Sequence, residues 1–195
     1  MRLRQLFTAI TILFSTSGFC AINANPGFYL GVDLEANHYG HPQGAAMGSD
    51  WLFGGLVRPV IGYRFNDYVA LEGGYNDIIN ENRSGNSFWG PDKLRIYSYD
   101  LSGKAILPLA NGFSIFGKGG LAYTHQYVYN VVFTGSAPTA DYTANRIQPL
   151  LGAGVSYNIS KNLAAEMSAS YYFKNGPVSA IEMIGIGAIY TFGDL

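Results

Sequence analysis

Six charged residues are the strongest candidates for chemistry in this sequence, because each stands among Gly, Ser and Thr on the polar side of a predicted strand. They are Glu72, Lys104, Lys118 and Glu166, at similar distances from short polar turns, with Asp33 and Arg58 as further members. Acidic and basic groups that are shielded from water require partners of opposite charge. We therefore predict an internal salt-bridge network. The alternative interpretation is a regulated path for protons or small ions.

The three histidines are where an enzyme would be sought, since a histidine with a serine and a carboxylate can form a nucleophilic site. His125 is followed by Gln126 and Tyr127, so no serine stands two residues further along the same face. His38 and His41 lie in a polar segment without an evident catalytic serine. These two histidines could also bind a metal ion, but no Cys or carboxylate stands at a fixed spacing to complete the ligand set. We predict no catalytic residue, no metal site and no cofactor.

Large aromatic side chains occur in the polar segments between the predicted strands. These candidates for contact with external molecules are Trp51, Phe88, Trp89 and Phe133. An aromatic residue in an exposed loop is typical of a binding surface when it is not packed against its own fold. Packing on the rim of the fold is the alternative.

Strict alternation of apolar and polar residues indicates β-strands as the elements that carry these groups. Between Phe28 and Asn37, for example, the odd and even positions separate completely into a polar and an apolar set. The same period of two is found in eight segments, of which this is the first. The predicted strands are 28–37, 53–65, 69–76, 97–107, 113–124, 151–158, 163–173 and 184–192.

The placement of aromatic residues favours a sheet whose apolar face points outward. One end of the strands carries Phe65, Phe113, Tyr157, Tyr190 and Phe192, and the other carries Tyr75, Tyr97, Tyr99, Tyr123, Tyr171 and Phe173. Two aromatic belts with an aliphatic band between them are typical of a transmembrane β-barrel. The Gly, Ser and Thr residues of the polar face suit the crowded interior of a narrow barrel.

Short and long connections alternate along the chain. The short ones are 66–67, 110–112 and 160–162, and the longer ones are 38–50, 79–93, 130–145 and 174–179. Outer-membrane barrels have short periplasmic turns and longer extracellular loops, so we predict that the longer connections face outward. Pro59 and Pro149 fall inside predicted strands, where each removes a donor, and we interpret them as marks of bulges near the outer rim.

The N-terminal segment has the features of a secretory signal peptide. Arg2 and Arg4 precede the apolar stretch 6–14, and small polar residues lead to a predicted cleavage after Ala24. A lipoprotein signal that uses Cys20 is the alternative, which Phe19 disfavours. We expect a mature chain of residues 25–195 as one barrel domain. It would contain no cysteine and therefore no disulfide.

The composition excludes several classes of protein. Charged residues make up 13% of the 195 residues and the formal net charge is −1, so a basic surface for nucleic acid is lacking. Aromatic residues reach 15%, and there are 25 glycines. This combination favours strands and turns over a helical bundle.

Several segments together resemble the OmpA-type eight-stranded outer-membrane barrels. They are residues 62–75, residues 100–105 with Pro108 and Leu109 after them, residues 152–157, and the closing stretch 187–192. The resemblance covers the whole mature chain and implies the outer membrane of a Gram-negative bacterium. It also implies that the internal charges close the lumen. The chain stops after the barrel, so a peptidoglycan-binding role of longer relatives is not implied, and the end of the chain differs from the usual terminal aromatic.

The sequence thus predicts an all-β protein, an eight-stranded antiparallel up-and-down transmembrane β-barrel. Its predicted role is structural or in surface interaction, as an adhesin or surface antigen with extracellular loops. The rival hypotheses are an outer-membrane lipid-modifying enzyme, a small gated pore and a soluble periplasmic binding barrel. The predicted partners are outer-membrane lipids, lipopolysaccharide, the barrel-assembly machinery and host surface molecules.

Overall fold

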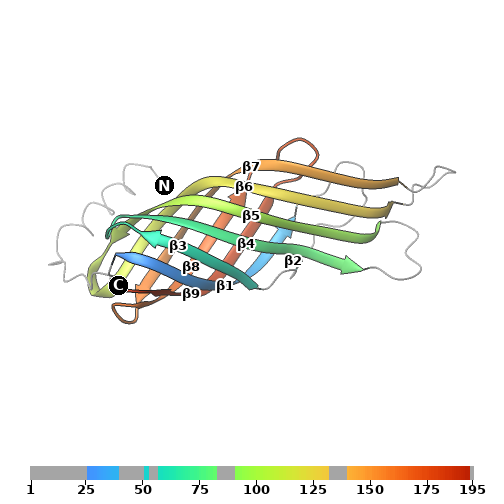
Figure 1. Ribbon diagram of the computed structural model, residues 1–195. Helices are drawn as coiled ribbons and strands as arrows, with labels where there is room; N and C mark the ends of the chain where they lie inside the picture. The colour runs from blue at the N-terminus through green and yellow to red at the C-terminus, as the bar shows by residue number, and fades with distance from the viewer. Residues whose placement is uncertain (1–25, 40–50, 53–56, 83–90, 132–139, 194–195) are drawn as a thin grey trace, which may run out of the picture.

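One antiparallel sheet that closes on itself forms the whole of the described structure (Figure 1). The computed structural model describes residues 26–39, 51–52, 57–82, 91–131 and 140–193. Its strands are β1 (Gly27–Tyr39), β2 (Trp51–Leu52), β3 (Val57–Arg64), β4 (Val69–Asn82), β5 (Pro91–Pro108), β6 (Phe113–Val131), β7 (Ala140–Asn158), β8 (Leu163–Tyr172) and β9 (Ile181–Thr191). In these segments, no helix has the length and apolar character needed to cross a membrane.

Eight of these strands make the barrel wall, and each pairs with its neighbour in the chain. The sheet closes where β1 pairs with β9, in an unbroken register from Tyr29↔Thr191 to Tyr39↔Ile181. The two-residue β2 pairs only with the end of β1, at Asn37 and His38. Because the sheet is closed, the backbone N–H and C=O groups of the wall find hydrogen-bond partners in neighbouring strands. A wall inside hydrocarbon requires this, since no water is available there. The predicted eight-stranded antiparallel barrel is confirmed.

The apolar side chains point out of the barrel and the polar ones point in. Leu101 is 57% exposed, whereas its neighbour Ser102 is 1% exposed. On β9 the outward Ile186 is 59% exposed, and the inward side includes the apolar Met183 and Ile189, which are buried in the lumen. A water-soluble barrel would bury its aliphatic face, so this arrangement is the inverted one that the sequence predicted.

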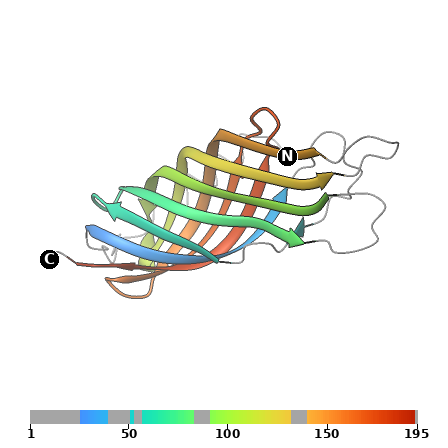
Figure 2. The ribbon, with the colours of Figure 1, turned by 45° about the vertical axis from the view of Figure 1, so that its right-hand side comes forward.

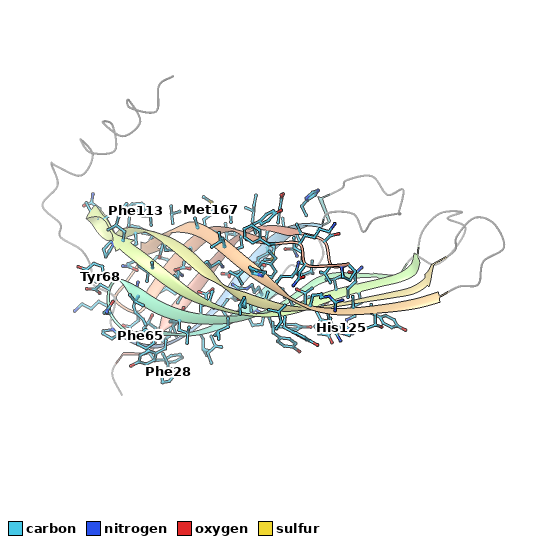
Figure 3. The ribbon with its side chains drawn as sticks, turned by 90° about the horizontal axis from the view of Figure 1, so that it is seen from above. Phe28, Phe65, Tyr68, Phe113, His125 and Met167 are labelled. Atoms are coloured by element: carbon cyan, nitrogen blue, oxygen red, sulfur yellow. The ribbon has the colours of Figure 1, made fainter. Side chains whose placement is uncertain are left out.

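Aromatic side chains form a ring at each end of the outward-facing aliphatic band. Figure 3 shows Phe28, Phe65, Tyr68 and Phe113 gathered at one end of the barrel. At the other end, Tyr99 is 55% exposed, Tyr123 is 45% exposed and Tyr171 is 38% exposed. Edge-to-face contacts join members of the rings, such as Tyr63 with Phe65 and Tyr171 with Phe173. The two predicted aromatic belts are therefore present.

The three short connections lie together at one end, which we call the turn end. Asn66 Oδ1 accepts hydrogen bonds from the backbone N–H groups of Tyr68 and Val69, at 2.8 and 2.9 Å. The second turn is a single-turn 3-10 helix, Ala110–Gly112. Its central residue, Asn111, has a left-handed backbone conformation with φ 59°. Ser160 Oγ accepts from Asn162 N and Leu163 N at 3.2 and 3.0 Å. Asn and Ser favour such turns because their side chains satisfy the freed backbone donors.

The strands of one wall are much longer than the alternation predicted. β5, β6 and β7 have 18, 19 and 19 residues, against 10 in β8 and 11 in β9. Figures 1 and 2 show β4 to β7 running on beyond the shorter strands at the end opposite the turns, which we call the tall end. The predicted long connections 79–93 and 130–145 were therefore wrong in their bounds. The sequence of these extensions, such as ADYTANR over residues 140–146, lacks a clean alternation of apolar and polar residues, although the ladder continues.

The interpretation of the two prolines as bulges was also wrong. Pro59 pairs with Val32 and Pro149 pairs with Leu121 without a break in register. On its other side, each proline lies next to the last pair of a ladder. Pro59 follows the end of the β3–β4 ladder at Val60↔Gly74, and Pro149 follows the end of the β7–β8 ladder at Leu150↔Tyr172. The missing N–H therefore falls at the end of a ladder, where it interrupts no run of bonds. The register shifts lie elsewhere, between Asp77 and Ile79 and between Val128 and Val131.

Candidate functional site

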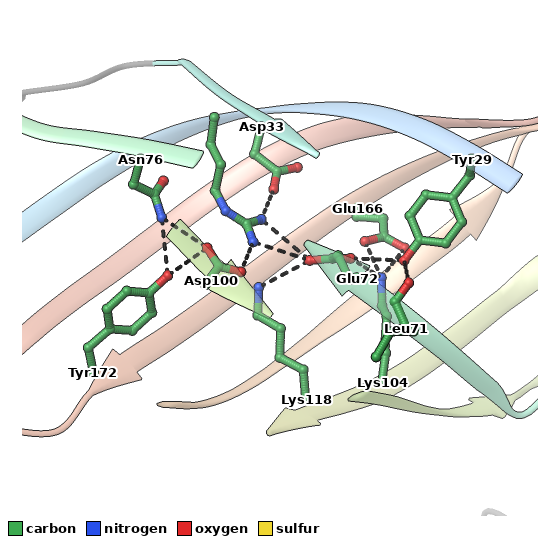
Figure 4. A network of polar contacts seen from close by, with 11 residues as sticks. Tyr29, Asp33, Leu71, Glu72, Asn76, Asp100, Lys104, Lys118, Glu166 and Tyr172 are labelled. Atoms are coloured by element: carbon green, nitrogen blue, oxygen red, sulfur yellow. Dashed lines mark hydrogen bonds and ion pairs between the residues drawn. The ribbon is translucent and has the colours of Figure 1, made fainter. Parts of the chain in front are cut away.

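Arg58 contacts three carboxylates of a buried charge cluster in the lumen. Figure 4 labels the residues around it, among them Asp33, Glu72 and Asp100. Its Nη1 lies 2.8 Å from Asp33 Oδ2, and its Nη2 lies 2.8 Å from Asp100 Oδ1. Glu72 Oε1 is 3.4 Å from the same guanidinium. The Arg58 side chain is 1% exposed. A planar guanidinium can bind several carboxylates in one plane, which a lysine ammonium cannot.

Glu72 connects the arginine to two lysines. Its Oε2 lies 3.6 Å from Lys104 Nζ, and its Oε1 lies 3.7 Å from Lys118 Nζ. The Tyr29 hydroxyl donates a hydrogen bond of 3.3 Å to Oε2. Glu72 is 3% exposed, so water contributes little to its stabilisation. One carboxylate thus has three cations around it.

Lys104 has its tightest contact with Glu166. The Nζ atom lies 2.6 and 2.8 Å from the two carboxylate oxygens. The same ammonium is 3.9 Å from the centre of the Phe116 ring, a cation–π contact. The structure brings together all six residues named from the sequence, Asp33, Arg58, Glu72, Lys104, Lys118 and Glu166.

The sequence analysis did not include Asp100, Tyr172 and Asn76 in this set. The Tyr172 hydroxyl donates to Asp100 Oδ2 at 3.0 Å, and Asn76 Nδ2 donates to the Tyr172 oxygen at 3.1 Å. Asp100 shares its parity with Ser102 and Lys104, so the alternation was a signal that could have found it. Tyr172 shares the parity of Glu166, Ser168 and Ser170, so the same alternation points it into the lumen, where it is 1% exposed.

Apolar lumen layers lie on both sides of the charge cluster. Along β4 the order is Ala70, Glu72, Asn76 and Ile78, with the charged residue between the two apolar ones. The turn-end layer consists of Tyr29, Val60, Ala70, Ile106, Phe116 and Ile189. The tall-end layer consists of Ile78, Ile96, Ala122, Leu150, Tyr172, Ile181 and Met183. Apolar side chains therefore flank the ion pairs on both sides, and within the cluster the Lys104–Glu166 pair lies nearest to the turn end.

Glycines in the lumen make room for the long charged side chains. A Cβ atom at Gly152 would lie 2.9 Å from Cγ and Cε of Lys118. At Gly187 it would lie 2.0 Å from Asp33 Oδ1. These positions cannot accept a side chain without displacing a member of the cluster.

The buried charges of the described lumen do not balance. Five lumen carboxylates (Asp33, Glu35, Glu72, Asp100, Glu166) face three lumen cations (Arg58, Lys104, Lys118), and all of these except Glu166 are buried. Glu35 is 3% exposed, and its Oε2 atom has no hydrogen-bond partner in the described part of the chain. Glu35 is thus the carboxylate that the ion pairs leave over.

The remaining candidates lie apart from the cluster. His38 Nδ1 is 3.5 Å from Glu182 Oε2, and His125 stacks on Tyr97 outside the barrel. Trp51 belongs to β2, but its side chain is not among those that the structure describes. The other candidates, His41, Phe88, Trp89 and Phe133, lie outside the described residues. Within the described ranges no group of three His, Cys, Asp or Glu side chains could hold a metal ion.

A small recess of about 20 Å³ lies at the turn end beside the charge cluster. Its lining includes Arg64, Lys161, Asn158 and Thr191 near the opening, and Lys104 and Glu166 further in. The Lys104–Glu166 pair and the Tyr29 ring form its inner wall. The Lys104–Glu166 pair is therefore the part of the cluster that this recess reaches.

Solved structures of bacterial outer-membrane barrels share this fold. Neisserial surface protein A matches with a TM-score of 0.59 at 18% identity, over 85% of this chain and 97% of that one. OprG from Pseudomonas aeruginosa matches with a TM-score of 0.58 at 13% identity, over 89% and 100%. The attachment invasion locus protein Ail of Yersinia pestis matches with 0.57 at 14% identity, over 86% and 99%.

Sequence comparisons give the family. An uncharacterized protein of Coxiella burnetii is 32% identical over 170 residues, which are 69% of this chain and 67% of that protein. Outer membrane protein A of Serratia marcescens is 25% identical over 95% of this chain, which spans 56% of the Serratia protein. The profile of the OmpA-like transmembrane domain matches residues 55–194. This chain therefore belongs to the OmpA-like transmembrane domain family, whose place is the outer membrane of Gram-negative bacteria.

Proposed function

We propose that this protein is a closed membrane scaffold that presents a tall sheet to the outside of the cell as a surface for contact with other molecules, in the manner of an adhesin or surface antigen. The observation that carries the proposal is the asymmetry of the wall. β5, β6 and β7 continue past the aromatic ring while β8 and β9 end close to it. Nothing in the membrane requires that extra length, because a tilted strand crosses with about 9–11 residues.

The tall sheet has backbone groups that its own barrel does not pair within the described residues. The pairing of β7 with β8 begins at Leu150↔Tyr172, and that of β3 with β4 stops at Val60↔Gly74. Beyond these points no described strand pairs with the outer side of β4 or β7. On β7 the connection after β8 covers the first part of this edge, since Phe173 N donates to Pro149 O and Asn175 Nδ2 donates to Ile147 O. A sheet edge can pair with an extended segment of another chain. Host surface molecules that present such a segment are the proposed partners.

The charge cluster supports the scaffold part of the proposal. Ion pairs between apolar layers fill the lumen with side chains that hold one another in place. An eight-stranded barrel has an interior just wide enough to be filled in this way. We propose no reaction for this site, since His38 and His125 make contacts with Glu182 and Tyr97 that serve packing.

A trimmed barrel tests the surface role. Residues 80–95 and 127–143 are each replaced by a two-residue Asn-Gly turn, which cuts the tall wall at the level where Ile96 pairs with both Ile79 and Gln126. Cells that make the intact protein should adhere to matrix components or epithelial cells more than cells without it. Cells with the trimmed barrel should not, although heat-modifiable gel mobility shows that the barrel has folded. Equal adhesion of both would contradict the role of the tall wall.

A small gated pore is the second candidate, and Glu72 is the observation that favours it. Because three cations surround this carboxylate, its partners could exchange without leaving it unpaired. Conductance of the purified protein in planar bilayers tests this alternative. Discrete openings that lengthen when Glu72 is replaced would support the pore, and a silent bilayer would support the closed scaffold.

A further inference from the structure

The recess at the turn end has more positive than negative charge in its lining. The described residues that line it include three cations, Arg64, Lys104 and Lys161, and one carboxylate, Glu166. Glu166 is held by Lys104, whose Nζ lies 2.6 and 2.8 Å from the two carboxylate oxygens. In Figure 4 this pair and Tyr29 lie together at one side of the charge cluster. The charges of Arg64 and Lys161 are therefore not neutralised within the recess.

Arg64 is the cation whose donors remain available. It is the last residue of β3, it shares the inward parity of Arg58, and it is half-buried. No ion pair or hydrogen bond joins its side chain to another described residue. Glu166 and Asp67 act on it electrostatically, but neither forms an ion pair with it. A guanidinium that is partly withdrawn from water favours an anionic partner.

The size of the recess limits the ligand. Its volume is about 20 Å³, and a space of about 10–15 Å³ holds one water-sized group. The recess therefore admits one or two oxygen atoms, whereas a whole phosphate or sugar is too large to enter. A carboxylate satisfies this limit, because its two oxygens match two parallel N–H donors of a guanidinium.

The recess is held in shape by several elements of the barrel. Lys161 belongs to the third short connection, where Asn162 Nδ2 donates to Thr191 O of β9 at 2.8 Å. Arg64 belongs to β3, and the Lys104–Glu166 pair joins β5 to β8. The closed sheet thus brings together cations from distant parts of the chain before any ligand arrives, which reduces the entropy cost of binding.

From this arrangement we infer that the turn-end recess binds a carboxylate group from the periplasm, at the end of a peptide or in a small organic acid. Arg64 donates hydrogen bonds to the carboxylate oxygens, and Lys161 adds positive charge at the opening. Lys104 stays with Glu166. The inference rests on the orientation of the barrel in the outer membrane and is independent of the proposed adhesion.

Nuclear magnetic resonance of the full barrel in detergent micelles tests the inference. The probes are acetate, N-acetyl-trialanine with a free carboxylate, the C-terminal amide of the same peptide, and inorganic phosphate. Both carboxylates should shift the backbone N–H resonances of Lys161, Asn162 and Leu163 in a saturable way, and the amide should not. A lower Kd for the peptide than for acetate would identify a peptide end as the ligand, and equal values would identify a small organic acid.

Variants of the recess separate this site from general charge effects. Arg64→Gln should raise the Kd about tenfold, as expected for the loss of a hydrogen-bonded charge. Arg64→Lys keeps the charge without the planar fork and should fall between the wild type and Arg64→Gln. Lys161→Gln should raise the Kd by about twofold, since this side chain is exposed. Lys174→Gln removes an exposed charge at the tall end and should leave the Kd unchanged.

The result that overturns the inference is equally specific. It would be the absence of a saturable shift with either carboxylate, binding of the amide or of phosphate as tight as that of the carboxylates, or a wild-type Kd in Arg64→Gln. Heat-modifiable gel mobility verifies that each variant has folded.

Discussion

Gly74 lies directly against the guanidinium of Arg58: a Cβ atom at residue 74 would come within 2.4 Å of Nη2 and 2.6 Å of Cζ. Arg58 is 1% exposed and binds Asp33 and Asp100 at 2.8 Å, so it has no free space into which to move. The ion pairs of Arg58 with Asp33 and Asp100 therefore require a residue without a side chain at position 74 of β4.

Gly74→Ala is expected to destabilise the barrel by about 1–3 kcal/mol, because overpacking forces the arginine out of its position. Urea unfolding from lipid vesicles measures the change. Gly103→Ala is the matched control: that glycine is on the exposed face of β5, and its added Cβ would meet nothing nearer than 4.0 Å. Equal effects of both changes would show that the contact with Arg58 is not the cause.

Glu72→Ala should cost about 3–5 kcal/mol, since it removes the carboxylate shared by three buried cations. Glu72→Gln should cost less, because its amide oxygen can still accept hydrogen bonds from Arg58 and Tyr29. The free energy of unfolding in vesicles is the measurement.

Glu35→Gln provides the contrast to the Glu72 variants. Glu35 is as buried as Glu72 but has no ion pair among the described residues, and its Oε2 atom has no hydrogen-bond partner. Its replacement by a neutral group of the same shape should leave stability unchanged or raise it. A loss as large as that of Glu72→Ala would refute the assignment of Glu35 as the surplus carboxylate.

Leu101→Arg should reduce stability by about 2–4 kcal/mol, the cost of an arginine on the lipid face near the middle of the bilayer. Leu101, Val155 and Ile186 are 57%, 41% and 59% exposed and belong to the outward band. Leu101→Ala removes the leucine without adding a charge and should cost much less. Folding yield into bilayers of defined thickness distinguishes the two, and wild-type stability of Leu101→Arg would reverse the assignment of faces.

Cysteine labelling of intact cells checks the orientation. Asn175 lies in the exposed connection after β8, where Asn175 and Val178 form a bridge, and Asp67 lies in a short turn at the opposite end. A membrane-impermeant maleimide should label Asn175→Cys on whole cells and Asp67→Cys only after the outer membrane is permeabilised. The reverse pattern would invert the predicted topology.

Much of this fold could be predicted from the sequence, because a period of two assigns each side chain to one face of a strand. The alternation in Phe28–Asn37 and its seven repeats determined the number of strands, the outward aliphatic band and the inward parity of Glu72, Lys104, Lys118 and Glu166. Turn chemistry at Asn66 and Ser160 marked the short connections. These are local properties, visible within a few residues of one strand.

Only the tertiary structure decided which charges meet and how far the strands run. Arg58 and Asp100 are 42 residues apart in the chain, and their 2.8 Å contact depends on the register of two ladders, which no single strand encodes. The lengths of β5 to β7 were equally hidden, because the alternation of apolar and polar residues fades in their extensions while backbone pairing continues the sheet. The sequence thus determined the face of each residue, and the closure of the sheet determined its partner.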